Sequence, residues 1–430
     1  MEEKKVEYIE LIYDLIFVYI VGRNNELLHV ISNGFIAPSA FLTYIVTALI
    51  VLQIWYYTTM YVNRHGENDK IMYAGIFINM YLLYYMAKGI RADWQGYYTN
   101  FNIAWALILI NIAVMYMIRL RYTDKTNETE RGGIRRNIVV LLVQATMVLV
   151  SVPVYRFTGV PLAPACMLFG IVMSIAGRCG SEVSSIDFNH LTERVMLYVV
   201  FTFGEMIIGI AGYFDGSFSA NTVYFSLCCF LIVVGLFVSY GYLYDHILDR
   251  NMTTNGTAYV MLHMFLILAL NHITAALEFM REAEVAELPK NLFLIGSFVL
   301  FFVLMYYIAH YSRADYKFSR KFSFELFSTL VIFVVLMLIT YKQPRISIAV
   351  TLMYIIFIYE LVSRHKRTNE MSGIPDGFTA DDIRIEASIC NGERTIGFYN
   401  ESEKKLYFAE LVKTDDDIAD FYKKYGLKRK

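Results

Sequence analysis

Long apolar stretches, each followed by a short polar segment, run through most of the chain. A helix needs about 20 mostly apolar residues to cross the hydrocarbon core of a bilayer, and about twelve stretches come close to this length. The pattern therefore predicts an all-α polytopic membrane protein. The predicted spans are a first one that begins near residue 6, then 41–60, 72–90, 101–118, 137–154, 162–176, 190–212, 222–244, 257–277, 292–311, 322–341 and 346–362.

Positive charge is distributed unevenly over the loops. The loops that follow even-numbered spans are rich in lysine and arginine, above all the segment 119–136, whereas the loops after odd-numbered spans carry fewer basic residues. Basic loops remain on the cytoplasmic side of a membrane. Both termini are therefore expected to be cytoplasmic.

The last part of the chain has a different character. Two segments with alternating polarity, IRIEASIC and TIGFYN, are separated by Asn391-Gly392-Glu393, which is typical of a hairpin turn. KLYFAEL follows as a third predicted strand, and DDDIADFYKKYGL as a helix. Residues 370–430 are thus expected to form a small cytoplasmic α+β tail, which is marginal in size for folding alone.

The predicted spans divide into two sets of six that resemble each other weakly. Matching features in the two sets are about 183 to 186 residues apart, and an even number of spans gives both halves the same orientation, as in parallel-repeat transporters. The expected domains are residues 1–178, 179–367 and 370–430. The alternative, that regular loops alone make a polytopic chain look periodic, stays open.

The composition agrees with a chain built for lipid. Charged residues make up 18% of the chain and hydrophobic residues 57%, whereas soluble domains carry roughly 25% charge. The net charge of −1 argues against a nucleic-acid partner. The five cysteines form no Cys-x-x-C pair and show no zinc-type spacing with histidine. We therefore expect no metal and no cofactor, and the lipid bilayer as the main partner.

Ionisable residues inside predicted spans are the candidate functional residues, because charge in hydrocarbon costs several kcal/mol unless it is paired or hydrated. Glu10 and Asp14 lie four positions apart on one face of the first helix. Thr202 and Glu205 share a face of the seventh helix, with Glu205 near mid-membrane, and His263 lies in the ninth. A second group is expected nearer the cytoplasm as a gate or ion pair: His190, Glu193, Arg194 and Asp245.

Simpler explanations of these residues stay open. Glu10 could be a first-turn acid favoured by the helix dipole, and Glu193 with Arg194 could form only an ion pair at the interface. Glu205 could be a structural tie to Arg23 or to a histidine.

Several segments resemble motifs of the bacterial low temperature requirement protein A (LtrA) family. VEYIELIYDLIFVYIV is similar to its E-L-F-F-D-L-V-F-V opening, and HLTERVMLYVVFTFGEMIIGI to its H-x-x-E-R…G-E signature. WYYTTMYVNRHGEND, GYLYDHI and AYVMLHMFLILAL match three further segments, the last two through Asp245 and His263. The resemblance covers residues 6–365 and implies a multi-pass protein of the bacterial inner membrane whose biochemical activity is not established.

These observations favour a transport protein that moves a small solute or ion, coupled to protons, through a site between the two repeats. Asp14 and Glu205 are the expected ionisable pair. A passive channel, a membrane-embedded enzyme that uses His190, Glu193 and Asp245, and a sensory or scaffold protein are the alternatives. The enzyme is the weaker of these because no hydrolase, P-loop or dinucleotide-binding motif is present. The sequence does not indicate the solute, the direction of coupling or whether the protein forms a homo-oligomer.

Overall fold

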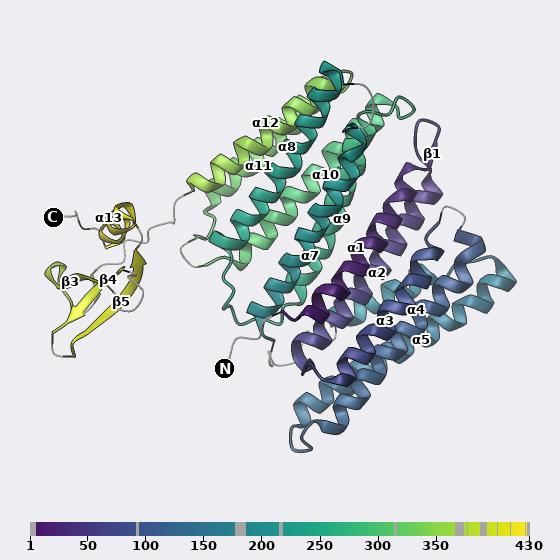
Figure 1. Cartoon of the computed structure of the whole chain (residues 1–430), viewed down its shortest axis with the longest axis horizontal. Helices are drawn as coiled ribbons and strands as arrows, with labels where there is room; N and C mark the ends of the chain where they lie inside the picture. Colours follow the sequence, from purple (N-terminus) through teal and green to yellow (C-terminus); the bar gives the residue numbers. More distant parts are fainter. Residues whose placement is uncertain are drawn as a thin grey trace. The chain divides into compact units, whose positions relative to one another are not determined.

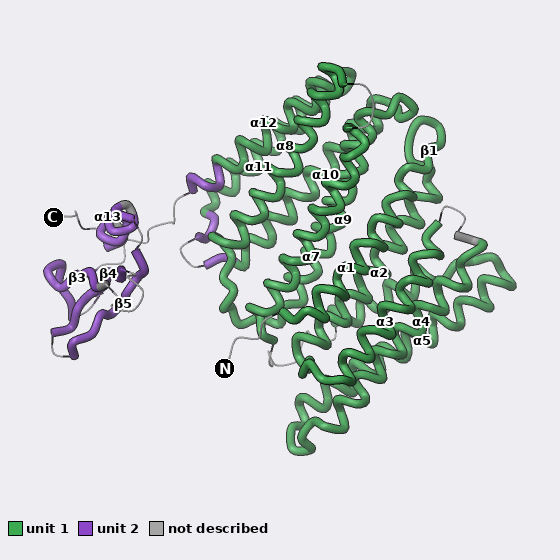
Figure 2. The backbone as a smooth tube through the Cα atoms, viewed as in Figure 1, with its two compact units in different colours: residues 1–311, 319–360 green, residues 312–318, 361–430 purple. Residues whose placement is uncertain are grey.

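The computed structural model divides the chain into two compact units. Unit 1 consists of residues 1–311 and 319–360, and unit 2 of residues 312–318 and 361–430 (Figure 2). The predicted turn at Asn391-Gly392-Glu393 lies outside the described residues. The structure describes residues 6–91, 94–176, 186–214, 218–313, 316–365, 374–375, 377–387, 394–401, 403–412, 414–425 and 427.

Unit 1 is helical, as the apolar pattern predicts. In the described part of the chain, nine helices are long and apolar enough to cross a membrane. Three others fall outside that set: α1 is charged, α3 is less apolar and α6 is short. The helices are α1 (Tyr8–Asn25), α2 (Pro38–His65), α3 (Lys70–Gly89), α4 (Trp94–Tyr122), α5 (Glu128–Thr158), α6 (Ala163–Ala176), α7 (Phe188–Gly209), α8 (Ala220–Tyr242), α9 (Thr257–Phe279), α10 (Glu287–Ile308), α11 (Arg320–Thr340) and α12 (Pro344–Arg364).

Side-chain caps explain where two of these helices begin. The Asp69 carboxylate accepts a hydrogen bond of 2.8 Å from the Met72 N–H at the start of α3. The Asp187 carboxylate accepts one of 3.0 Å from the His190 N–H at the start of α7. Such caps satisfy backbone donors that the first helical turn leaves unpaired. The cap at Asp187 also sets the first turn of α7, which carries His190.

Helices α1 and α2 lie between two groups of helices, α3 to α5 on one side and α7 to α10 on the other (Figure 1). Helix α1 packs against α2, α3 and α7, and α7 packs in turn against α8 and α9. α1 ends in a 3₁₀ turn, Glu26–His29, and a short hairpin of β1 (Ile31–Ser32) and β2 (Phe35–Ile36) leads to α2. Polar residues of α1 therefore face helices from the second half of the chain.

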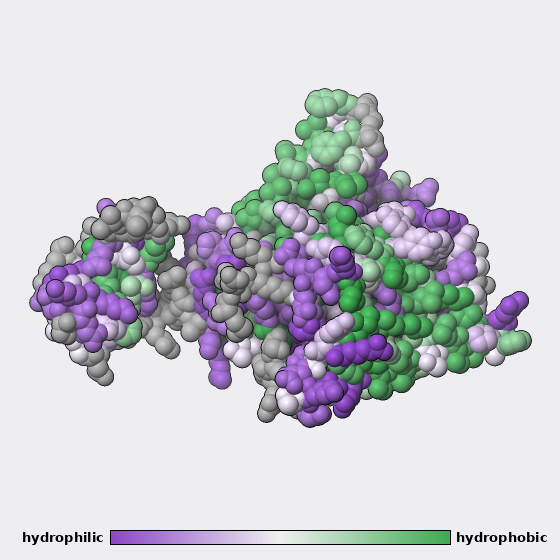
Figure 3. All heavy atoms as spheres, turned by 60° about the horizontal axis from the view of Figure 1, so that its bottom comes forward, coloured by the Kyte–Doolittle hydropathy of each residue, from purple (hydrophilic) through white to green (hydrophobic). Residues whose placement is uncertain are grey.

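The outer surface of unit 1 is apolar where it would meet lipid. Hydrophobic side chains cover much of the face seen in Figure 3. On α11, Phe324, Val331 and Ile339 are 74%, 62% and 73% exposed. Contiguous apolar surface of this kind is rare on soluble monomers. The protein is accordingly a multi-pass membrane protein.

A network of buried amides ties α2 to α5 and α6. The Gln144 Nε2 donates to Gln53 Oε1 at 2.7 Å and to the Cys166 carbonyl at 3.1 Å. The Tyr57 hydroxyl donates to Gln144 Oε1 at 2.9 Å. A Cβ added at Gly170 would lie 2.3 Å from Gln144 Nε2 and 2.5 Å from Gln53 Nε2. The glycine therefore makes room for the amides.

Replacing Gly170 with alanine is expected to destabilise the protein by about 1–3 kcal/mol, because the added methyl group must displace hydrogen-bonded amides that have no free space. Gly296→Ala is the matched control: Gly296 lies in α10, and a Cβ there would meet nothing within 4 Å. Helix propensity predicts that this control stabilises by up to about 1 kcal/mol. Thermal unfolding of the purified protein measures both, and equal midpoints for the two variants would contradict the packing argument.

Unit 2 contains a small α+β element. Strands β3 (Ile383–Ala387), β4 (Arg394–Asn400) and β5 (Lys405–Val412) form an antiparallel sheet in that order, followed by α13 (Asp415–Lys424). These strands and this helix fall on the segments in which the sequence predicts them. Their common core is small and consists of Ile396, Phe398, Val412, Ile418, Phe421 and Tyr425.

Candidate functional site

Four ionisable side chains meet between α1 and α7. Glu10 and Asp14 lie one turn apart on α1, and His190 and Arg194 lie one turn apart on α7. All four side chains have 0% exposed area. Both helices are therefore joined at one end by charge that has no access to solvent. We call Glu10, Asp14, His190 and Arg194 the ion cluster.

Arg194 is the centre of the ion cluster. Its Nη1 donates to Glu10 Oε2 at 2.9 Å, and its Nη2 donates to Asp14 Oδ1 at 3.1 Å. Trp55 of α2 also donates its indole N–H to Asp14 Oδ1, at 2.8 Å. One guanidinium thus bridges two carboxylates, and a third helix orients one of them.

The hydrogen bonds of His190 assign its protonation. The Asn63 amide nitrogen lies 3.1 Å from His190 Nδ1 and donates to the Asp187 carbonyl at 2.9 Å. Because an amide nitrogen only donates, Nδ1 is the acceptor and the imidazole proton lies on Nε2. That Nε2 is 3.2 Å from Glu10 Oε1 and donates to it. His190 is therefore neutral in this arrangement.

The charges of the ion cluster do not balance. Counted over these four side chains alone, two carboxylates face one guanidinium and a neutral imidazole, so the four together carry one excess negative charge when both acids are ionised. Asp14 Oδ2 and Arg194 Nε have no hydrogen-bond partner among the described residues. An unbalanced buried charge costs several kcal/mol. The arrangement is thus suited to taking up one proton.

Glu205 lies on the same contact between α1 and α7, at a different level. A Cβ added at Gly22 of α1 would be 3.1 Å from Glu205 Oε2. Glu205 is eleven residues beyond Arg194, which is about 16 Å along the axis of α7. Asp14 is bound by Arg194 and Trp55 rather than by Glu205. The two expected members of the ionisable pair therefore occupy separate positions along one seam.

The other residues singled out from the sequence have different surroundings. The Thr202 hydroxyl donates to the Tyr198 carbonyl of its own helix at 3.0 Å. His263 is fully buried, and its Nδ1 donates to the Tyr259 carbonyl at 2.8 Å, whereas its Nε2 has no partner in the described part of the chain. Glu193 is partly buried and Asp245 is exposed.

The structure does not support two of the simpler explanations, an ion pair of Glu193 with Arg194 and a tie of Glu205 to Arg23. The partners of Arg194 are Glu10 and Asp14, on another helix, rather than its neighbour Glu193. Arg23 pairs with Glu26 rather than with Glu205.

Sequence reasoning missed the two residues of α2 that support the ion cluster. Trp55 and Asn63 lie on the long apolar helix α2, where the run WYYTTMY resembles an aromatic belt at a membrane interface. Trp55 is instead fully buried. Two signals were available in the sequence: Trp55 and Asn63 both belong to the segment WYYTTMYVNRHGEND, and they lie eight residues apart, about two turns on the same face.

A second ionic contact joins the halves at the other end of α1. The His29 Nε2 lies 2.8 Å from Glu278 Oε2, and its Nδ1 lies 3.4 Å from Glu282 Oε1. The hydrogen bond that His29 donates to Glu278 and the charges of both acids raise the pKa of His29 above its ordinary value. When it is protonated, the imidazole forms an ionic link between the 3₁₀ turn that follows α1 and the end of α9.

Stability is expected to depend on the protonation of His29. Because the folded-state pKa is raised, the contribution is complete below the unfolded pKa of about 6.5 and is lost as the pH rises through the folded value. Solvent screening limits it to about 1 kcal/mol or less. His29→Gln should flatten the fall of the unfolding midpoint as the pH rises above about 6.5.

His310→Gln is the control for His29→Gln, since it replaces an exposed histidine that is bonded to a backbone carbonyl. The control should leave the pH profile as it is in the unmodified protein. A profile that is unchanged in His29→Gln would show that this contact does not titrate in the range.

The described residues contain no group of three or more histidine, cysteine or acidic side chains arranged to hold a metal ion. The ion cluster offers hydrogen bonds and charge.

Comparison with known proteins identifies one family. The sequence model of the bacterial low temperature requirement A protein (LtrA) matches residues 5–358. Neither the curated proteins nor the solved structures include a significant match.

Proposed function

The chain belongs to the bacterial low temperature requirement A protein (LtrA) family, and on this premise we propose that it moves a small solute or ion across the bacterial inner membrane, coupled to protons. The observation that carries the proposal is the unbalanced charge of the ion cluster. Two fully buried carboxylates share one guanidinium between helices from the two halves of the chain. A stable structural tie would be expected to have matched charges.

The proposal includes a parallel repeat of two six-helix halves, residues 1–178 and 179–367, followed by the cytoplasmic tail 370–430. The beginnings of three of the six pairs of corresponding helices support it, whereas the other three pairs begin 187 to 193 positions apart. Tyr8 and Phe188 begin α1 and α7, 180 positions apart; α2 and α8 begin 182 apart, and α6 and α12 begin 181 apart. α1 and α7 both continue into a 3₁₀ turn, at Glu26–His29 and Ile210–Phe214.

In the proposed repeat, the members of the ion cluster occupy equivalent positions in the two halves. Glu10 and His190 are 180 positions apart, and so are Asp14 and Arg194. Equivalent positions in the two halves thus carry groups of opposite type, and these groups bind each other where α1 meets α7. Rearrangement of one half against the other, the usual motion of repeat-built transporters, would have to separate these pairs.

Protonation is the proposed trigger of that motion. With one proton bound, the ion cluster is neutral and remains buried at low cost. After the proton leaves, the excess negative charge favours admission of water and separation of α1 from α7, because charge is far more stable in a hydrated cavity. In this proposal Glu205, Thr202 and His263 line the path, and Glu193 and Asp245 form its cytoplasmic gate with His190 and Arg194.

Flux in proteoliposomes tests the proposal. The protein is reconstituted with a pH-sensitive dye inside the vesicles, a pH gradient is imposed, and a panel of inorganic ions, amino acids and organic acids is added outside. Coupled transport predicts a change of internal pH that depends on one of these solutes. Flux driven by voltage alone, without proton movement, would instead identify a passive channel.

Variants assign the roles of the two proposed ionisable residues. Glu205→Gln should reduce the coupled flux if the seam between Gly22 and Glu205 is part of the path. Equal fluxes in the unmodified protein and Glu205→Gln would remove Glu205 from the mechanism. Asp14→Asn tests the ion cluster separately.

A further inference from the structure

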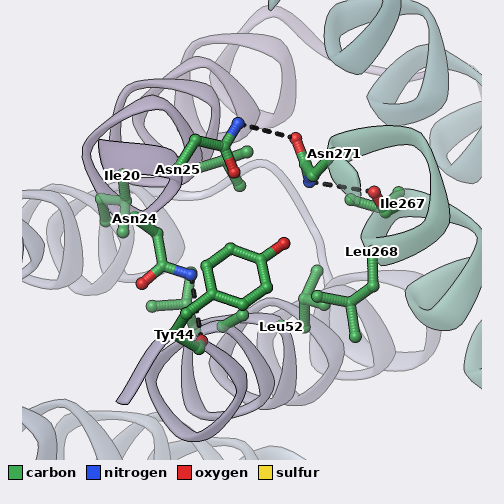
Figure 4. A pocket seen from close by; sticks show the side chains of 11 residues that line it. Ile20, Asn24, Asn25, Tyr44, Leu52, Ile267, Leu268 and Asn271 are labelled. Carbon is green, nitrogen blue, oxygen red and sulfur yellow. Dashed lines mark hydrogen bonds between the residues drawn. The ribbon is translucent and has the colours of Figure 1, made fainter. Parts of the chain in front are cut away.

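A small chamber lies between α1, α2 and α9 (Figure 4). It adjoins Asn24 and Asn25 at the end of α1, whereas the ion cluster lies near the start of that helix. Its volume is about 10 Å³, and its walls are mostly aliphatic side chains such as Ala48, Leu52 and Leu268. Four polar residues interrupt this lining: Asn24, Asn25, Tyr44 and Asn271. The chamber is thus an apolar box with a few polar groups brought to it from three helices.

Most polar atoms of the chamber are already bonded to one another or to the backbone. Asn25 Nδ2 donates to Asn271 Oδ1 at 3.1 Å, which connects α1 with α9. Asn271 Nδ2 donates to the Ile267 carbonyl at 2.9 Å, and Asn24 Nδ2 to the Tyr44 carbonyl at 3.1 Å. These bonds fix the orientation of the amides, as the dashed lines in Figure 4 indicate.

Two polar atoms at the chamber remain without a partner in the described structure, the hydroxyl of Tyr44 and Oδ1 of Asn25. Tyr44 is only 1% exposed, and its hydroxyl points into the space between α1 and α9 (Figure 4). A buried polar atom that makes no hydrogen bond costs about 1–3 kcal/mol. Native proteins seldom leave such atoms unpaired, and two around one cavity indicate that something fills it.

We propose that the chamber is a binding site for a single uncharged, water-sized molecule that both donates and accepts hydrogen bonds, with water itself as its ordinary occupant. The hydroxyl of Tyr44 donates to the oxygen of this molecule, which donates in turn to Asn25 Oδ1. A cavity of about 10–15 Å³ holds about one water, and a buried water needs two to four polar partners.

The lining excludes other classes of occupant. Every side chain around the chamber is uncharged, and an ion without a counter-charge would be costly there. The volume excludes anything much larger than water. The bound molecule completes the link of α1 and α2 to α9 that Asn25 and Asn271 begin. This inference rests on the chamber alone and holds whether or not the protein is a transporter.

Two substitutions are expected to shift the unfolding midpoint in opposite directions depending on whether the chamber is occupied or empty. If a water is bound, Tyr44→Phe removes its donor and should lower the unfolding midpoint by about 2–4 °C. If the chamber is dry, the same change deletes an unpaired hydroxyl and should raise the midpoint or leave it unchanged. Tyr84→Phe, at an exposed tyrosine of α3, is the control and should have no effect.

Filling the chamber gives the second test. Ala48→Val should displace the water, strand the polar groups of Tyr44 and Asn25, and lower the midpoint. In a dry chamber the added methyl groups would improve packing and raise it. In the Tyr44→Phe background the loss caused by Ala48→Val should be smaller, since part of the interaction is already gone. Additive losses would overturn the proposal.

Direct observation and an ion control complete the experiment. A high-resolution map of the full chain in lipid nanodiscs should show an ordered density within hydrogen-bond distance of both Tyr44 and Asn25, and an empty chamber would overturn the proposal. Midpoints measured in sodium chloride and in choline chloride should agree. A sodium-dependent rise that disappears in Tyr44→Phe would show that the occupant is a cation, which also contradicts the proposal.

Discussion

Replacing Arg194 with glutamine is expected to lower the free energy of unfolding by about 3–5 kcal/mol, enough to prevent accumulation of folded protein. The substitution leaves Glu10 and Asp14 facing each other with no exposed area and no cation between them. Removing one member of a buried ion pair destabilises a protein far more than replacing the whole pair by apolar residues of similar volume. Thermal unfolding and yield in detergent measure the effect.

Arg23→Gln is the matched control, since Arg23 also pairs with a glutamate, Glu26, but the Glu26 side chain is 60% exposed. Exposed pairs of this kind contribute about 0–1 kcal/mol. Adding Glu10→Gln and Asp14→Asn to Arg194→Gln should recover most of the lost stability, because the cluster then has no uncompensated charge. Similar losses for Arg194→Gln and Arg23→Gln would refute the central place of Arg194.

Glu10→Gln and Asp14→Asn, made singly, should each abolish proton coupling while the protein remains folded. Either change leaves one carboxylate for one guanidinium, so the ion cluster is neutral without an added proton. No excess negative charge then remains to favour binding of a proton. The flux driven by a pH gradient should fall at least about tenfold, which corresponds to about 1.4 kcal/mol. The dye-loaded proteoliposomes described above provide the measurement.

The double variant Glu10→Gln with Asp14→Asn distinguishes charge counting from a general loss of contacts. It leaves Arg194 buried without a carboxylate, so it should be markedly less stable than either single variant. Thr146→Val serves as the control, because Thr146 is an exposed residue of α5 whose hydroxyl donates to the Leu142 carbonyl of its own helix. Pronounced pH-driven flux in both single variants would exclude the ion cluster as the proton-binding site.

The links along α1 share one pattern. Glu10 and Asp14 bind α7 near the start of the helix, Gly22 lies against Glu205 further along, and Asn25 and His29 reach α9 at its far end. Each link connects the first half of the chain to the second. Helix α1 is therefore the element through which a movement between halves would be transmitted.

The sequence alone predicted the helical architecture, the charged helices and the family of this protein. The apolar stretches predicted the membrane-crossing helices, since the length and hydrophobicity of a span are local properties that need no partner to be recognised. The spacing of Glu10 and Asp14 on one face and the H-x-x-E-R segment located the charged helices, and the motifs indicated the family that the comparison confirms. A charge inside a span is conspicuous because hydrocarbon penalises it wherever it lies.

Only the tertiary structure decided how those charges are used. It brought Arg194 to Glu10 and Asp14, added Trp55 and Asn63 from α2, and set Asp14 and Glu205 at different levels of one seam. The hydrogen bonds of Asn63 also assigned a neutral His190, from which the unbalanced charge follows. The rotation and register of one helix against another depend on the packing of every side chain between them. Residues 180 positions apart therefore carry no local sign of their contact.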